Sequence, residues 1–118
     1  TKTVIHSYES PTSITGDHLH AYAIEVSSLQ VHELEQMRSG EQHWYRADQA
    51  PPVLNDAIAF VGSWLHELPW FPDEAALRSS DYYVYPWSIQ LHGVRPSAAT
   101  LIFVRPADKM VFYVSGET

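Results

Sequence analysis

The chain of 118 residues contains no cysteine, which excludes disulfide bonds, thiolate nucleophiles and zinc–thiolate sites. It also lacks any run of about 18 apolar residues, the length that a membrane-spanning helix needs. Residues 1–13 show neither the charged nor the apolar region of a signal peptide. From these absences we expect a cytoplasmic protein of bacterial type with no membrane segment.

Basic residues are scarce, with seven Lys and Arg against fourteen Asp and Glu and a net charge of −7. Residues 1–81 hold twelve of these acids and four of the bases, whereas residues 82–118 carry a net charge of +1. Nucleic-acid binding depends on clustered Lys and Arg, so the sequence argues against it. An acidic surface attracts basic partners. We therefore expect the partner to be another protein of basic character.

Catalytic motifs are missing as well. The five glycines are scattered, so the chain has no phosphate-cradling loop and no Gly-x-Ser-x-Gly elbow. His66-Glu67 is not half of a zinc-protease motif, because Trp70 stands where the second histidine would be and Pro69 breaks the helix. No spacing selects an acid–base pair. The sequence thus favours a binding role over an enzymatic one, with no cofactor.

Two histidines, His18 and His20, are the only metal-ligand candidates. With Glu25 they form H-x-H-x4-E, which resembles the first metal motif of the cupins and implies two imidazoles on one face of a strand. Glu25, however, lies an odd number of residues from both histidines, so it would face away from them. The second cupin motif is missing. We therefore expect no metal.

The last third of the chain predicts three consecutive antiparallel strands. In the first of them Trp87, Ile89 and Leu91 alternate with polar residues, so we expect these three on one face. The other two are apolar on both faces, as strands covered on two sides are. The predicted strands cover residues 87–94, 100–104 and 110–114.

A helix is predicted after Pro51 and Pro52, which suit a first turn. Apolar residues recur at helical spacing from Leu54 to Leu68, and Pro69 ends the helix. Such a wide stripe needs a sheet to cover, and the C-terminal strands provide one. The expected core comprises Ile58, Val61, Leu65, Ile102, Val104, Phe112 and Val114, with Phe103 and Val111 if both faces of the sheet are covered.

The segment from Ser28 to Gly40 has two interpretations. Ser27 and Gln30 have the capping-box arrangement, and the Glu, Gln, Met and Leu content favours a helix. The alternative is a strand that pairs with residues 43–47 across the Ser-Gly turn. We favour the helix.

With two further strands in residues 2–8 and 19–26, the predicted order of elements is β-β-α-β-α-β-β-β. This order predicts a single α+β domain over residues 1–118. Two helices pack on a mainly antiparallel sheet of five to six strands, which ends in a C-terminal three-stranded meander.

Large aromatic residues gather at residues 68–72 and 82–87, on either side of a short polar segment. Prolines within both clusters place them in loops or at a strand edge, where they cannot all be interior. The alternative is that they close one end of the core. Tyr and Trp anchor protein interfaces, and acidic residues lie beside them here. The predicted partner-binding residues are Trp70, Asp73, Glu74, Asp81, Tyr82, Tyr83 and Tyr85.

We therefore expect a small acidic protein-binding domain, an inhibitor or immunity protein that neutralises a basic partner such as a toxin. Residues 80–86 resemble the toxin-binding stretch of the colicin DNase immunity proteins, which are all-helical, over less than a tenth of the chain. A secretion chaperone is a variant of this role, and a homodimer is compatible with it. The alternative is an enzyme or ligand binder with an aromatic-lined pocket formed by Tyr22, Trp64, Trp87 and Tyr113.

Overall fold

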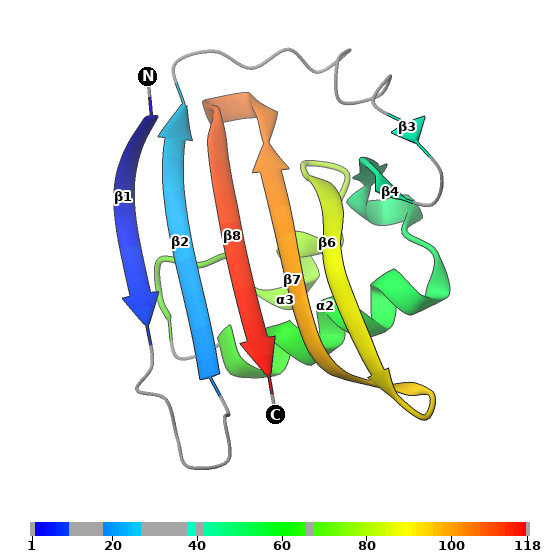
Figure 1. Ribbon diagram of the computed structural model, residues 1–118. Coiled ribbons are helices and arrows are strands. Elements are labelled where there is room, and N and C mark those ends of the chain that lie inside the picture. The colour runs from blue at the N-terminus through cyan, green and yellow to red at the C-terminus, as the bar shows by residue number, and fades with distance from the viewer. Residues whose placement is uncertain (1, 10–17, 27–37, 40–41, 66–67, 118) are drawn as a thin grey trace.

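The computed structural model describes residues 2–9, 18–26, 38–39, 42–65 and 68–117, and a six-stranded antiparallel sheet dominates it (Figure 1). The strands lie in the order β1-β2-β8-β7-β6-β5. Strand β2 therefore pairs with the last strand, β8, which is far from it in the sequence. The predicted α+β class and the C-terminal meander are confirmed. The strands are β1 (Lys2–Glu9), β2 (His18–Val26), β5 (Tyr45–Arg46), β6 (Tyr83–His92), β7 (Arg95–Arg105) and β8 (Met110–Glu117).

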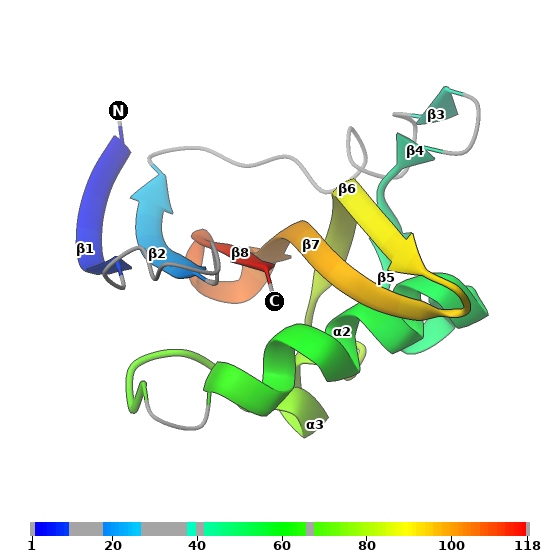
Figure 2. The same ribbon diagram turned by 60° about the horizontal axis from the view of Figure 1, so that its bottom comes forward.

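Two helices, α2 (Pro52–Leu65) and the single-turn α3 (Glu74–Leu77), lie on one side of this sheet (Figure 2). Helix α2 begins at the second proline, as the sequence predicts, and the Asn55 side chain donates a hydrogen bond of 2.9 Å to the Ala50 carbonyl just before it. The helix buries the expected apolar stripe against the sheet. The buried residues of α2 are Leu54, Ala57, Ile58, Val61 and Leu65.

A small hairpin of β3 (Arg38–Ser39) and β4 (Gln42–His43) lies on the other side of the sheet from the helices (Figure 2). Most of the predicted helix from Ser28 to Gly40 lies outside the described residues. Its described end, however, forms β3, which satisfies its backbone groups by pairing with β4. At this end the alternative interpretation was correct in predicting a strand, but of its predicted partner, residues 43–47, only His43 pairs with β3, and Tyr45–Arg46 pairs with β6 instead.

The face of the sheet toward the helices carries the main hydrophobic core. Register pairs Phe103 with Phe112 on this face, and it pairs Ile102 with Tyr113 on the opposite face. The expected core was therefore wrong in part, because Ile102 and Val104 face away from the helices. Neighbouring residues of a strand alternate between faces, and both faces of β7 are apolar, so the sequence did not distinguish them. The buried residues on the helix side of the sheet include Ala21, Ala23, Val84, Ala99, Leu101, Phe103, Phe112 and Val114.

Strand β6 differs most from its prediction, because it begins at Tyr83 and contains Pro86. Strand β5 pairs only with Tyr83 and Val84, so Pro86 lies at an edge of the described sheet, where a missing N–H breaks no pairing. A register shift follows between Pro86 and Ser88. This shift puts Trp87 and Ile89 on opposite faces, and the prediction that they share one was wrong.

Candidate functional site

The structure divides the predicted partner-binding residues between the two faces of the sheet. Trp70, Asp73, Glu74 and Asp81 lie on the helix side, in the segment that leaves α2 and passes through α3. On the same side, Tyr82 is part of the core. The remaining two residues, Tyr83 and Tyr85, are on β6 and face the other way, opposite Val104 and Ile102.

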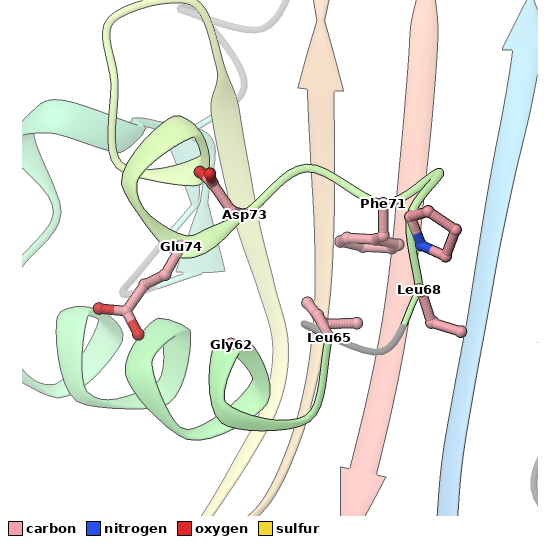
Figure 3. A pocket seen from close by; sticks show the side chains of 7 residues that line it. Gly62, Leu65, Leu68, Phe71, Asp73 and Glu74 are labelled. Carbon is pink, nitrogen blue, oxygen red and sulfur yellow. The ribbon is translucent and has the colours of Figure 1, made fainter.

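Of these helix-side residues, Asp73 and Glu74 line a cleft of about 590 Å³ between α2 and the segment that follows it (Figure 3). Leu65, Leu68 and Phe71 provide apolar walls, and the carboxylates of Asp73 and Glu74 lie on the other side. The full lining is Gly62, Leu65, Leu68, Pro69, Phe71, Asp73 and Glu74. Carboxylates beside apolar residues match a Lys or Arg side chain, which has an aliphatic stem and a cationic end.

Both carboxylates are held in position by local contacts. Asp73 is the N-cap of α3 and accepts a hydrogen bond of 2.8 Å from the Ala76 N–H. Glu74 lies 3.3 Å from the Arg78 guanidinium, which also donates to the Asn55 carbonyl of α2 at 3.0 Å. Helices α2 and α3 approach so closely that a Cβ at Gly62 would lie 3.0–3.2 Å from Glu74. The acidic side of the cleft is therefore preformed.

Trp70 lies beside the cleft and is partly exposed. Its indole stacks on the imidazole of His6 in β1, with ring centroids 5.1 Å apart and an angle of 18° between the planes. It also contacts Phe71, which packs edge-on against Phe112 in the core. The segment after α2 is thus fixed to the sheet at two points, and part of the indole remains available to a partner.

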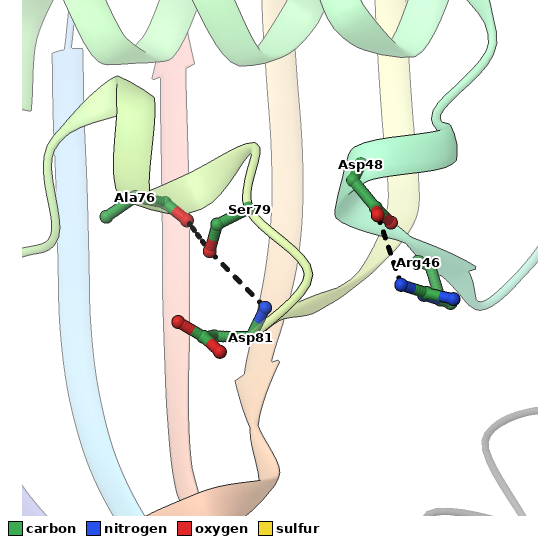
Figure 4. A network of polar contacts seen from close by, with 5 residues as sticks. All are labelled: Arg46, Asp48, Ala76, Ser79 and Asp81. Atoms are coloured by element: carbon green, nitrogen blue, oxygen red, sulfur yellow. Dashed lines mark hydrogen bonds and ion pairs between the residues drawn. The ribbon is translucent and has the colours of Figure 1, made fainter.

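Asp81 lies in an ordered turn after α3 (Figure 4). The Ser79 hydroxyl donates to the Ala76 carbonyl at 2.7 Å, and the Asp81 N–H donates to that hydroxyl at 3.3 Å. The Asp81 side chain is exposed. Residues 47–81, which contain α2, the cleft and this turn, carry six acids and one base in the sequence, a net charge of −5.

Tyr82 is buried inside the domain and bonded to another residue, so it offers little surface to a partner. It is buried, and its hydroxyl accepts a hydrogen bond of 2.8 Å from the Arg105 guanidinium. Burial raises the pKa of Tyr82, against the opposing effect of Arg105. The same guanidinium donates twice to Asp108, at 2.9 and 2.8 Å, and these bonds lower the pKa of that carboxyl. Together with Phe112, whose ring lies under the guanidinium, these groups close one end of the core.

Of the tyrosines on the other face, Tyr83 is buried against Val104, Trp44 and Val111. Tyr85 is partly exposed, and its ring contacts those of Trp44 and Trp87 at 5.3 and 6.4 Å. The binding role of these residues remains a prediction. Burial leaves Tyr85 as the one tyrosine of the three with surface to offer a partner.

On this open face, which none of the described helices covers, the register aligns side chains into rows that cross the sheet. An aromatic row runs from Ser7 through Tyr22, Tyr113 and Ile102 to Tyr85. Tyr22 and Tyr113 lie with ring centroids 5.6 Å apart. No local sequence pattern indicates this row, because its members come from five strands and meet only when β2 pairs with β8.

A polar row lies next to the aromatic one. It runs from Glu9 through His20, Ser115 and Thr100 to Ser88. The hydroxyls of Ser115 and Thr100 are 2.9 Å apart. Between the two rows, Tyr22 donates a hydrogen bond to the Glu9 carboxylate, and this bond is the main reason that the pKa of Tyr22 is raised.

His20, one of the two metal-ligand candidates, therefore lies between Glu9 and Ser115, while the side chain of His18 lies outside the described part. The described side chains contain no group of three His, Asp or Glu placed to hold a metal ion. None of the helices described here has the length and apolar character to cross a membrane.

The four residues expected to line one aromatic pocket do not meet. Tyr22 and Tyr113 are on the open face, and Trp87 contacts Tyr85 there. Trp64 is on α2, on the opposite side of the sheet, where its indole lies against Gly116 of β8. The sheet separates them, so this prediction was wrong.

No family model, curated protein or solved structure shows significant similarity to this chain.

Proposed function

We propose that this domain works by binding a basic protein, as an inhibitor or immunity protein that neutralises its partner. The supporting observation is the preformed cleft between α2 and α3, with apolar walls and two fixed carboxylates. The cleft belongs to the helix layer, residues 47–81, which carries a net charge of −5. A Lys or Arg side chain of the partner would insert here, and Trp70 would cover it from the β1 side. This role places the protein in the cytoplasm that it protects.

The negative charges of the helix layer attract the partner before contact, and the cleft retains it after contact. Exposed acids such as Asp81 and Asp56 attract a basic partner over a distance of roughly one Debye length, about 10 Å at moderate salt. In the complex, contact with the partly exposed Trp70 adds the area that holds the partner in place. Charge thus governs the rate of association, and the cleft with Trp70 governs dissociation.

The test begins with identification of the partner, by affinity capture on the immobilised protein followed by mass spectrometry. Association and dissociation rates of the purified pair are then measured over a range of salt. Asp81→Lys should slow association by about tenfold at low salt, and the effect should shrink as salt rises. Glu117→Lys is the matched control, because it makes the same change of charge at the end of β8, on the opposite face.

Trp70→Ala tests the contact surface. We expect it to accelerate dissociation and to weaken binding by about 2 kcal/mol, with the fold checked by circular dichroism. Equal effects of Asp81→Lys and Glu117→Lys would show that only total charge matters and would exclude this surface. An inhibitor abolishes its partner's activity, whereas a secretion chaperone leaves that activity intact, so an activity assay of the complex separates these two roles.

A further inference from the structure

Strand β1 is the outermost strand at one end of the sheet, and no described strand pairs with its outer edge (Figure 1). Its apolar residues are unusually open, with Val4 59%, Ile5 45% and Tyr8 38% exposed. The other end of the sheet closes with β5, which has only two residues. A long edge strand with apolar side chains is a template for pairing with another strand.

The strand carries an irregularity that makes it complementary to itself. The register with β2 shifts between Val4 and His6, so Ile5 is an extra residue. Positions 2 and 4 therefore share a sheet face with positions 7 and 9, and position 3 shares the opposite face with positions 6 and 8. Without the shift, alternation would put positions 4 and 7 on opposite faces.

This pattern selects one antiparallel register between two copies of β1. When Val4 lies opposite Ser7 of a second copy, position 3 lies opposite Tyr8 and Lys2 lies opposite Glu9. Every such pair shares a sheet face, and the outermost pairs join opposite charges at both ends of the strand. Directly opposed unlike charges stabilise strand pairing, and like charges destabilise it.

We infer that β1 pairs with β1 of a second copy of this chain, about a two-fold axis between Ile5 and His6, so that the two six-stranded sheets form one continuous sheet. At this axis the His6 imidazole stacks on the Trp70 indole of the same copy. Such a contact is isologous and closes at two copies. Pairing would cover the exposed apolar residues of both edges.

The experiment is sedimentation equilibrium of the 118-residue chain over a wide range of concentration. We expect a reversible dimer with twice the monomer mass of 13.4 kDa. Lys2→Glu places Glu opposite Glu9 at both ends, and Glu9→Lys places Lys opposite Lys2. Each variant should therefore weaken the dimer by roughly tenfold or more.

An equal mixture of Lys2→Glu and Glu9→Lys should recover the dimer, because the mixed pair again joins opposite charges. Glu9→Lys also removes the bond from Tyr22, but Lys2→Glu does not, so the mixture separates pairing from this local effect.

A monomer at every concentration would overturn the inference. A dimer insensitive to both variants, or one that the mixture does not restore, would overturn it too, because another surface would then join the copies. Asp81→Lys should leave dimerisation unchanged. The dimer and the proposed partner binding can thus fail independently.

Discussion

The two faces of the sheet are built from the same strands but differ in what they can do. On the helix side, Phe112 is 2% exposed and packs against the rings of Phe71 and Tyr82. On the open face, its neighbour Tyr113 is partly exposed and contacts Tyr22. Two adjacent residues of β8 thus differ in environment, because Phe112 is buried in the core and Tyr113 is partly exposed to solvent. Stability should reside mainly in the first face, and on the second in the small buried cluster around Tyr83 and Val104.

The negative charge is concentrated on the side of the sheet that carries the helices, whereas the larger aromatic surface is on the open face. The helix layer, residues 47–81, has a net charge of −5, whereas residues 82–118, which form the meander, have a net charge of +1. The aromatic row of the open face contains no ionisable group apart from its tyrosines. A basic partner would therefore be drawn to the helix layer, although the larger aromatic surface is on the other face.

The largest contrast is expected between Phe112→Ala and Tyr113→Ala. Removing the Phe112 ring leaves a cavity in the core and should lower the free energy of unfolding by about 3–5 kcal/mol. Removing the Tyr113 ring loses mainly a cross-strand contact at the surface, at a cost of about 1 kcal/mol. Urea unfolding measures both. Similar losses for the two variants would mean that the open face is covered as firmly as the helix face.

A second contrast compares substitutions at two adjacent residues of β8, Gly116 and Ser115. A Cβ at Gly116 would lie 2.0 Å from the Trp64 indole on the helix side, so Gly116→Ala must displace that ring. We expect a loss of about 1–3 kcal/mol. Ser115→Ala, on the open face, removes only the contact with Thr100 and should cost about 1 kcal/mol or less.

The control for Gly116→Ala is the same substitution in a Trp64→Leu background, where the obstructing ring is absent. There it should add little to the cost of Trp64→Leu alone. A full additional loss would show that backbone conformation, rather than the contact with Trp64, requires glycine at this position.

These contrasts depend on register, and register is what the sequence revealed least. Alternation located the three C-terminal strands but put Ile102 and Val104 on the wrong face, because residues 100–104 and 110–114 are apolar on both sides. Which face of these strands is turned toward the helices depends on the pairing of β2 with β8, two segments that are far apart in the chain. The rule against proline in strands failed at Pro86 for a similar reason, since it describes interior strands and Pro86 lies at an edge.

The candidate site was accessible from the sequence only in part. Asp73 and Glu74 stood out because acids beside large aromatics are unusual, and both do border the cleft. The walls supplied by Leu65 and Gly62 had no local signal, because α2 reaches the cleft only after the chain has turned back. Tyr82 was misleading, because it is buried and its hydroxyl bonds to Arg105, which comes from another strand.

A smaller effect is expected at the end of the core, from Asp108. Its pKa is lowered in the folded state by the hydrogen bonds from Arg105, so its ionisation stabilises the fold above the unfolded pKa of about 3.9. That contribution is lost as the pH falls through the lowered folded pKa. The side chain is 51% exposed, so solvent screening limits it to about 1 kcal/mol or less. Asp108→Asn should lower the urea midpoint at neutral pH, and this difference from the unmodified protein should disappear in acid.

The smallest change sharpens the comparison of the two faces, because two tyrosines have raised pKa values for different reasons. On the open face, Tyr22 owes its raised pKa chiefly to the bond with Glu9, whereas Tyr82 owes its own to burial on the helix side. Glu9→Gln should therefore move the pKa of Tyr22 back toward its ordinary value of about 10 and leave Tyr82 unchanged. An NMR titration of the tyrosine ring carbons follows both, with Tyr82→Phe to assign the buried residue. A Tyr22 titration unaffected by Glu9→Gln would show that the bond to Glu9 does not form in solution, whereas a shift of both residues would mean that β1 influences the core through the sheet.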